Sequence, residues 1–436
     1  MARWAVEVQV LSSAFRRSDR SVVVLVATKR VVVVGAGLSG LTCAYRLTRA
    51  GVDAVVLEAR ERVGGRAWRV PLDGGLEFDA GCEAADEAHQ ALLELAAELG
   101  VATRLAEPWV DELAPDLDEA DLAVFDGFQT EIDALAKRID PLHPDAFEEA
   151  GALDAQTLGG RLMELGASPS LLATAEAWYS VAASTVPIGD MSLFAYAAKL
   201  AAGAAPNGLR VRFEGGPTAL AEAMATLLDG RVRTGAQVVA IESETSGVRI
   251  LLADGAVERG SRCVVAMPLT VQRSLRFEPE LAPQRIEALA RAGYGNVVKA
   301  ALAYAATPPG PYPIVRESGI LYQLDHAPEL VVFFAGSRPG RQLTALPEGK
   351  RRTRIAALAG GDPSTVRAVA WSQEPFTLGS YLIFGPSELT TWGRHLAEPH
   401  GRIHFAGAEA SPLPSYMNGA VIAGERAARE VLAALT

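Results

Sequence analysis

Three glycines spaced as Gly-x-Gly-x-x-Gly, Gly35, Gly37 and Gly40, are the first residues of the chain whose spacing could do chemistry. Glycines in this pattern allow a tight turn, a close approach of the backbone to a pyrophosphate, and close packing of a helix on a strand. Glu58 follows further along the chain and could accept hydrogen bonds from a ribose diol. The spacing therefore predicts a site for a dinucleotide.

The segments around these glycines have the patterns of the elements that such a site requires. Residues 30–34 are a β-branched run, which is typical of a parallel strand buried on both faces. Residues 41–50 have helical apolar spacing and stop at Gly51, and residues 52–57 form a second extended run that ends at the acid. Together they predict a βαβ unit in which the helix N-terminus holds the phosphates.

The rest of the chain changes between helical and extended patterns, without an internal repeat. Residues 85–204 are rich in Ala and Leu at helical spacing and are predicted to form a helical insertion. The extended signal returns from about residue 208. The later predicted features are a hairpin at Asp254-Gly255, a buried strand over 263–268, mixed short elements over 276–374, a strand over 402–407 and a helix over 418–435.

Composition limits the class of protein. The chain has 436 residues, 49% of them hydrophobic and 21% charged, which is enough for two or three packed domains. A net charge of -11 repels phosphate backbones and argues against nucleic acid as a partner. Three widely spaced cysteines indicate neither disulfides nor a metal site, and Lys29 and Arg30 interrupt the longest apolar run, so no membrane span is expected.

The N-terminal 28 residues allow two interpretations. Arg16-Arg17 followed by the apolar residues 21–27 resembles a twin-arginine export signal, but the apolar part is short and runs directly into the first strand. The alternative, which we favour, is a disordered tail or a misassigned start. With few cysteines, a cytoplasmic location is expected.

The C-terminal segments are specific enough to compare with a known family. Residues 401–409 and 415–427, with the sequences GRIHFAGAE and SYMNGAVIAGERA, closely resemble the C-terminal flavin motif of the monoamine oxidase family. Other segments resemble further motifs of that family and occur in its order. They are residues 58–66, 264–268 and 295–299, and the residues Trp371, Gly379 and Tyr381.

The resemblance implies a mixed α/β (α+β) fold with two domains and FAD as cofactor. The Rossmann-like FAD-binding domain would be discontinuous, and a helix-rich and β substrate-binding domain would cover the flavin. The implied FAD-binding segments are 29–90, 205–275 and 375–436, and the implied substrate-binding segments are 91–204 and 276–374.

The resemblance also assigns three catalytic residues. Tyr381 and Tyr416 match the two aromatic residues that sandwich the amine beside the flavin, although isolated tyrosines more often serve in packing. Lys299 matches the lysine that holds a water at flavin N5 and assists reoxidation. The alternative for Lys299 is an edge-strand lysine whose ammonium reaches solvent.

The remaining predicted site residues would contact FAD or support its loop. Their alternatives are ordinary structural roles: buried packing for the tryptophan, surface exposure for the arginines, a generic strand for the valine and a helix-capping acid for the glutamate near the C-terminal motif. The predicted FAD-binding residues are Gly35, Gly37, Gly40, Glu58, Arg60, Gly65, Arg66, Val238, Trp371, Gly407, Glu409 and Met417, and no metal ligand is predicted.

Departures from the family pattern refine the prediction. Several members carry a cysteine between Gly and Tyr that binds FAD covalently, whereas here Ser380 stands between Gly379 and Tyr381, which predicts non-covalent FAD. Residues 77–83 depart from the commoner Gly-Gly-x-Trp form, which leaves local substrate contacts open. The Gly-Pro-Met-Arg run with which amino-acid oxidases bind a carboxylate is missing, which favours a primary or secondary amine.

The expected function is therefore FAD-dependent oxidation of a small amine, by hydride transfer to flavin N5 and reduction of O2 to hydrogen peroxide. Two alternatives within enzymes are an L-amino-acid oxidase and a tailoring oxidase of natural products. An alternative from another class is a non-catalytic FAD-binding protein. Members of the family are often homodimers, and variable segments provide the substrate pocket, for which Phe194, Tyr196 and Tyr322 are candidates.

Overall fold

The computed structural model describes residues 29–106, 117–204, 209–310, 314–316, 318–324 and 326–436. The tail or export signal considered for residues 1–28 lies outside the described residues. The predicted βαβ unit is confirmed: strand β1 (Val31–Val34), helix α1 (Leu38–Arg49) and strand β2 (Ala54–Leu57) follow one another, and β1 and β2 pair in parallel.

This unit lies in a five-stranded parallel sheet of order β19-β12-β1-β2-β8. All four residues of β1 are buried, which explains its unbroken run of valines. Val31 and Val33 pack into the core with α1 and α14, and Val32 and Val34 pack against strands β9 and β10. The other strands are β8 (Val232–Arg233), β12 (Arg262–Val265) and β19 (Ile403–Phe405).

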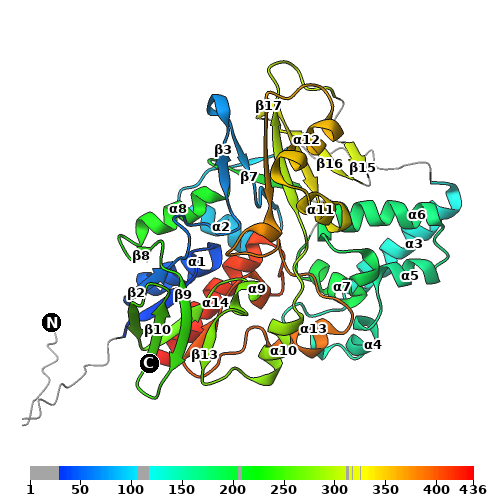
Figure 1. The fold of residues 1–436 in the computed structure, drawn as a ribbon. Helices are drawn as coiled ribbons and strands as arrows, with labels where there is room; N and C mark the ends of the chain where they lie inside the picture. The colour runs from blue at the N-terminus through cyan, green and yellow to red at the C-terminus, as the bar shows by residue number, and fades with distance from the viewer. Residues whose placement is uncertain (1–28, 107–116, 205–208, 311–313, 317, 325) are drawn as a thin grey trace, which may run out of the picture.

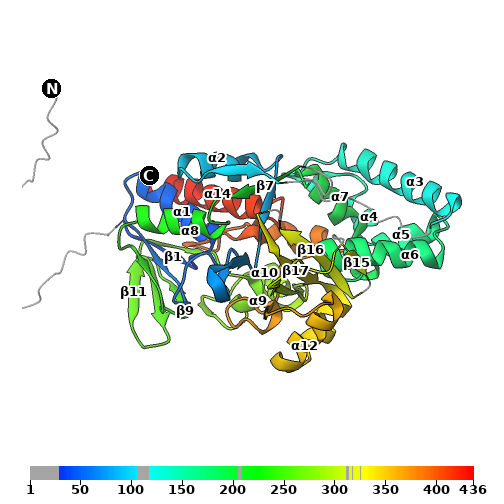
Figure 2. The ribbon, with the colours of Figure 1, turned by 90° about the horizontal axis from the view of Figure 1, so that it is seen from above.

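The second layer is an antiparallel sheet with one parallel edge, of order β11-β10-β9-β13. The predicted hairpin is confirmed, because Asp254 and Gly255 lie in the turn between β10 and β11. The parallel sheet is therefore covered by helices on one face and by this sheet on the other (Figures 1 and 2). Its strands are β9 (Val238–Ser243), β10 (Val248–Leu252), β11 (Val257–Gly260) and β13 (Arg276–Glu278).

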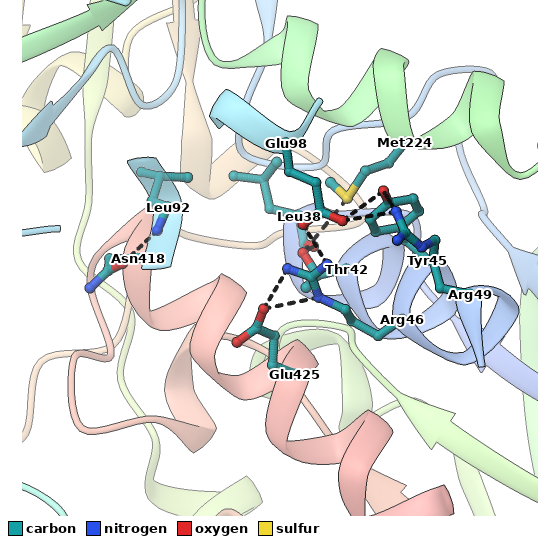
Figure 3. A network of polar contacts seen from close by, with 10 residues as sticks. All are labelled: Leu38, Thr42, Tyr45, Arg46, Arg49, Leu92, Glu98, Met224, Asn418 and Glu425. Atoms are coloured by element: carbon teal, nitrogen blue, oxygen red, sulfur yellow. Dashed lines mark hydrogen bonds and ion pairs between the residues drawn. The ribbon is translucent and has the colours of Figure 1, made fainter. Parts of the chain in front are cut away.

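Three helices on the first face are joined by the polar network in Figure 3. Arg46 on α1 donates to Glu98 at 2.6 Å and to Glu425 on α14 at 2.8 Å, and Tyr45 donates to Glu98 at 2.9 Å. The network joins three helices that are far apart in sequence. They are α1, α2 (Gln90–Glu98) and α14 (Met417–Leu435), and α8 (Thr218–Leu227) packs beside them.

The other end of the molecule carries a second large sheet, of order β15-β16-β17-β14-β18, with helices beside it (Figures 1 and 2). All of its pairings are antiparallel. Its strands are β14 (Val298–Ala303), β15 (Ile314–Arg316), β16 (Gly319–Leu324), β17 (Ala327–Ala335) and β18 (Thr365–Ala370). Two smaller sheets contain β3 (Arg69–Pro71) with β4 (Glu77–Asp79), and β5 (Ala84–Asp86), β7 (Arg210–Phe213) and β6 (Thr103–Leu105).

The described part of the insertion predicted over residues 85–204 is mostly helical, with two exceptions. Its first residues, 85 and 86, belong to β5, and residues 103–105 form β6, because both strands pair with β7. Leu92 and Leu95 of α2 pack in the core with α1 and α14. The division of the chain into two domains stays a prediction. The helices of the insertion are α3 (Glu119–Ala136), α4 (Ala150–Asp154), α5 (Leu158–Glu164), α6 (Pro169–Ala175), a π-helical turn (Glu176–Ser184) and α7 (Leu193–Ala201).

Short helices complete the later part of the chain, and they are α9 (Leu269–Gln272), α10 (Pro283–Arg291), α11 (Ser337–Thr344), α12 (Glu348–Ala359) and α13 (Glu388–Thr391). All three cysteines are free. Among the helices that the structure describes, none is long and apolar enough to cross a membrane.

Candidate active site

The three glycines between β1 and α1 have different surroundings. Gly35 has a φ of +104°, and a Cβ there would lie 2.9 Å from the Ala266 carbonyl oxygen. A Cβ on Gly40 would lie 2.0 Å from the Gly35 oxygen, so this glycine packs the helix against the turn. A Cβ on Gly37 would meet nothing within 4 Å, because Gly37 faces an open cavity. The loop thus has a bare backbone where a ligand can approach.

The N-terminus of α1 at this loop suits an anion. No side chain caps the helix at Gly37, and its first turn contains no acidic residue. The free N–H groups and the helix dipole therefore favour a phosphate. Glu58 lies beside the loop at the end of β2 and is 5% exposed, and its carboxylate accepts from the Ala36 N–H at 2.8 Å and the Arg60 N–H at 2.9 Å. Two bonds leave lone pairs for a ribose hydroxyl.

A cavity of about 430 Å³ runs from the glycine loop to the second large sheet. It brings together thirteen of the fifteen predicted site residues, from segments separated by hundreds of positions in the sequence. The thirteen are Gly35, Gly37, Glu58, Arg60, Gly65, Arg66, Val238, Lys299, Trp371, Tyr381, Gly407, Tyr416 and Met417. The two others, Gly40 and Glu409, lie behind this wall and support it.

Arg66, which lines the cavity, pairs with Glu409, which is buried behind the cavity wall. The Arg66 guanidinium donates to Glu409 at 2.7 Å and to the Ser380 carbonyl oxygen at 3.0 Å, and Tyr294 donates to the same Glu409 oxygen at 2.6 Å. Burial works to lower the pKa of Arg66, but Glu409 and Tyr294 raise it above its ordinary value. Glu409 therefore holds the arginine in place, which is more than a capping role.

Arg60 lies at the glycine-loop side of the cavity. It donates to the Thr377 hydroxyl at 2.6 Å and to the Phe376 carbonyl oxygen at 3.3 Å. Burial lowers its pKa, but an arginine remains charged at physiological pH. A cation held beside the bare glycine loop is suited to a phosphate.

Tyr381, Tyr416 and Trp371 bring their rings to the other part of the cavity. Burial, and then the neighbouring Tyr416, raise the pKa of Tyr381. Burial also raises the pKa of Tyr416, so both rings remain neutral phenols. The Trp371 indole donates to the Ala80 carbonyl oxygen at 2.8 Å, which fixes its ring plane. The Trp371 ring is therefore held in place, and the two tyrosine rings are uncharged.

Lys299 lies on a central strand, so the edge-strand interpretation is wrong. Strand β14 pairs with β17 on one side and β18 on the other, and Lys299 is 4% exposed. Its ammonium donates to Glu83 at 2.7 Å and to the Gly81 carbonyl oxygen at 3.1 Å. The lysine is thus a paired, buried cation at the cavity wall.

Among the polar residues that line the cavity, sequence reasoning missed Glu83, His89 and Lys199 as site residues. Lys199 lies over the Tyr416 ring at 5.7 Å from its centroid, and the His89 ring meets Tyr416 edge-on at 5.1 Å. The available signal for Lys199 was a single charge within the apolar helix over residues 192–201. Burial lowers the pKa of Lys199 to about 8 and that of His89 to about 4.

The three candidates for the substrate pocket have different places. Phe194 is fully buried in a helical core and lines neither described cavity, because it packs against Phe147. Tyr196 lines a small neighbouring cavity that shares Lys199 with the main one. Tyr322 donates to Glu83 at 2.6 Å from behind the wall.

The fold and the cavity together define a dinucleotide-binding protein whose nucleotide loop and aromatic wall share one cavity. The model of flavin containing amine oxidoreductases matches residues 38–432. A flavin-containing amine oxidase of Oncorhynchus mykiss is 28% identical over 451 residues, which cover 92% of this chain and 85% of the relative. The chain therefore belongs to the family of flavin-containing amine oxidoreductases and is a flavin-containing amine oxidase.

Solved structures confirm the predicted fold class. Putrescine oxidase with bound putrescine superposes with a TM-score of 0.82 at 22% identity, covering 93% of this chain and 99% of that chain. Cyclohexylamine oxidase from Brevibacterium oxydans superposes with a TM-score of 0.79 at 24% identity, covering 94% and 99%. The cofactor of this family is FAD, and the residues around Gly37, Glu58 and Arg60 fit it. Ser380, which has no thiol, agrees with non-covalent binding.

Proposed function

We propose that the protein oxidises a primary or secondary amine by removing hydride from the carbon beside the nitrogen, with dioxygen as the electron acceptor. FAD, when bound, supplies the hydride acceptor and then passes two electrons to dioxygen to give hydrogen peroxide. The imine product would be hydrolysed by water to an aldehyde and ammonia or a smaller amine. Gly37, Arg60 and the α1 N-terminus would hold the phosphates, and Glu58 would hold the ribose.

The observation that supports this proposal most is the convergence of Tyr381, Tyr416 and Lys299 on the cavity that contains the nucleotide loop. Neutral, electron-rich ring faces can accept N–H···π contacts from the nitrogen of a neutral amine. Fixed rings also restrict the direction of the α-carbon, which contributes to the rate by orientation. The rings of Tyr381 and Tyr416, here called the cage, would therefore bind and orient the substrate. Lys299 would assist reoxidation of the flavin.

The proposed reaction needs no protein base, and the described carboxylates of the cavity are already engaged by protein donors. Among the residues that the structure describes, the carboxylates lining the cavity are Glu58 and Glu83, and both accept bonds from protein donors. His89 is neutral above about pH 4, since burial lowers its pKa to about 4. An amine that enters as the neutral base can lose hydride without a protein base.

A hydrogen-peroxide release assay on the purified flavoprotein tests the proposal, with monoamines, diamines, polyamines and L-amino acids as substrates. Tyr416→Ala removes a ring of the cage and should lower kcat/KM for the best amine by about tenfold or more. Tyr416→Phe keeps the ring and is the matched control, which should retain most activity. Equal loss in both variants, with FAD content unchanged, would contradict the cage.

A second candidate is an amine that also carries a carboxylate, as an amino acid does. The observation in its favour is Lys199, a cation over the Tyr416 ring for which the described residues provide no carboxylate partner. Activity restricted to amino acids and lost in Lys199→Met would favour this candidate. Anaerobic bleaching of the flavin by any amine would exclude a non-catalytic role. The cytoplasmic location and the homodimer stay predictions.

A further inference from the structure

Glu83 and Lys299 on the cavity wall, with Arg212 and Tyr322 behind it, form a group of four side chains that has the carboxylate of Glu83 at its centre. One Glu83 oxygen accepts from the Lys299 ammonium at 2.7 Å and from the Tyr322 hydroxyl at 2.6 Å. The other oxygen accepts from the Arg212 guanidinium at 2.5 Å. The four residues come from separate elements: Glu83 directly precedes β5, and the others lie on β7, β14 and β16.

The group is buried and carries fixed charge. Lys299 is 4% exposed, Tyr322 7% and Arg212 9%. Burial alone would raise the pKa of Glu83, but the charges of Lys299 and Arg212 outweigh it and lower the pKa to about 2. Glu83 is therefore ionised wherever the enzyme works, and it is a permanent partner for the lysine.

The neighbouring charges do not compete for Lys299. Asp79, another carboxylate that interacts electrostatically with Lys299, accepts two hydrogen bonds from Arg69, at 3.1 and 2.9 Å. Of the three N–H donors of the Lys299 ammonium, two are used by Glu83 and the Gly81 carbonyl oxygen. One donor remains for a water or a ligand in the cavity, and the two protein bonds restrict where it can point.

We propose that Glu83 is the positioning residue for Lys299, and that it fixes the ammonium at the cavity wall during reoxidation of the flavin. The proposal rests on the proposed function for the oxygen step, in which reduced flavin and one dioxygen, with two electrons and two protons transferred, give oxidised flavin and one hydrogen peroxide. Glu83 contacts neither reactant and acts through the lysine. Tyr322 and Arg212 hold the carboxylate in turn.

The test is stopped-flow reoxidation by oxygen of enzyme reduced with dithionite, which needs no amine. Glu83→Gln keeps the shape but removes the charge, and it should slow reoxidation about tenfold, since charge-assisted hydrogen bonds are about twice as strong as neutral ones. Glu83→Asp keeps the charge and should lose less. The control Glu98→Gln removes an acid of the α1 network that does not line the cavity, and it should reoxidise normally.

A double-mutant comparison separates positioning from general structural damage. If Glu83 acts through Lys299, Glu83→Gln should add no slowing in a Lys299→Met background. The proposal would be overturned if the double variant were slowed by the product of the two single effects. It would also be overturned if Glu83→Gln were reoxidised at the normal rate while Lys299→Met were slow. If Glu83→Gln does not fold, Tyr322→Phe replaces it in the same comparison, with about threefold slowing expected.

A crystal structure of Glu83→Gln gives a readout that is independent of activity. The Lys299 ammonium should leave the Gly81 carbonyl oxygen, which it meets at 3.1 Å in the native chain. An ammonium that stays in place would refute positioning by Glu83. The reoxidation experiment uses dithionite in place of an amine substrate. If no amine gave peroxide, the proposed function would be rejected, but the role of Glu83 in reoxidation could still be tested.

Discussion

Lys199 should destabilise the folded protein, because it is a charged side chain in the cavity with no carboxylate partner among the described residues. Burial lowers its pKa from the ordinary 10.5 to about 8. This difference corresponds to at most about 3 kcal/mol, since each tenfold change in a proton equilibrium is about 1.4 kcal/mol. Water in the cavity and the contacts of the ammonium with the Tyr196 and Tyr416 rings reduce this free-energy penalty. We therefore expect Lys199→Met to stabilise the folded protein by about 1–2 kcal/mol.

The pH dependence gives the direction of the effect. A lysine with a lowered folded pKa costs its full penalty below about pH 8, and the penalty fades as pH rises towards 10.5. The gain from Lys199→Met should therefore be largest at pH 7 and nearly absent above pH 10. For a chain of this length, about 1 kcal/mol shifts Tm by about 1 °C, which differential scanning fluorimetry at saturating FAD resolves.

The second lysine of the cavity provides the matched control. Lys299→Met leaves Glu83 buried without its partner, so it should lower Tm at pH 7. The two substitutions are chemically identical and should have opposite signs. If Lys199→Met lowers Tm equally at pH 7 and pH 10, then the ammonium is not an uncompensated charge and the reasoning is wrong.

Three further predictions concern the cofactor. Gly37→Ala adds a Cβ that meets no protein atom within 4 Å, so the protein should fold with an unchanged apoprotein Tm but bind FAD much more weakly in a fluorescence titration. Gly40→Ala places a Cβ 2.0 Å from a backbone oxygen, and it should lower the apoprotein Tm as well, by overpacking worth about 1–3 kcal/mol or more. Because Ser380 has no thiol, acid precipitation should release all of the FAD to the supernatant, and yellow pelleted protein would contradict this.

The nucleotide half of the site was predictable because its signals are contiguous. The valines of β1, the glycine loop and Glu58 lie within one βαβ unit, where local turns and packing fix their positions. The C-terminal motif is equally local, since Tyr416 immediately precedes helix α14. In these segments the order of residues in the chain already determines which of them meet.

The partners of Lys299 were not predictable, because they depend on pairing between strands far apart in sequence. Glu83 is 216 positions from the lysine and 239 from Tyr322. Alternation along residues 297–304 placed Lys299 on an apolar face, but only the pairing of β14 with two neighbours shows that the strand is central. The family resemblance indicated Lys299. Its counter-ion, Glu83, lies in residues 77–83, where the sequence departs from the family pattern, so the resemblance did not indicate it.

The charges of Lys299 and Lys199 would together make the proposed cage favour the neutral form of the amine, which is the form that can react. Glu83 compensates Lys299, but below about pH 8 Lys199 is a cation over Tyr416 with no carboxylate partner in the described part of the chain. A protonated amine in the cage would meet this charge in a partly desolvated cavity, whereas a neutral amine would not. Only the neutral amine has the lone pair that hydride loss requires. Lys199 would therefore work against the unreactive ammonium form, and its cost to stability is consistent with a role in the site.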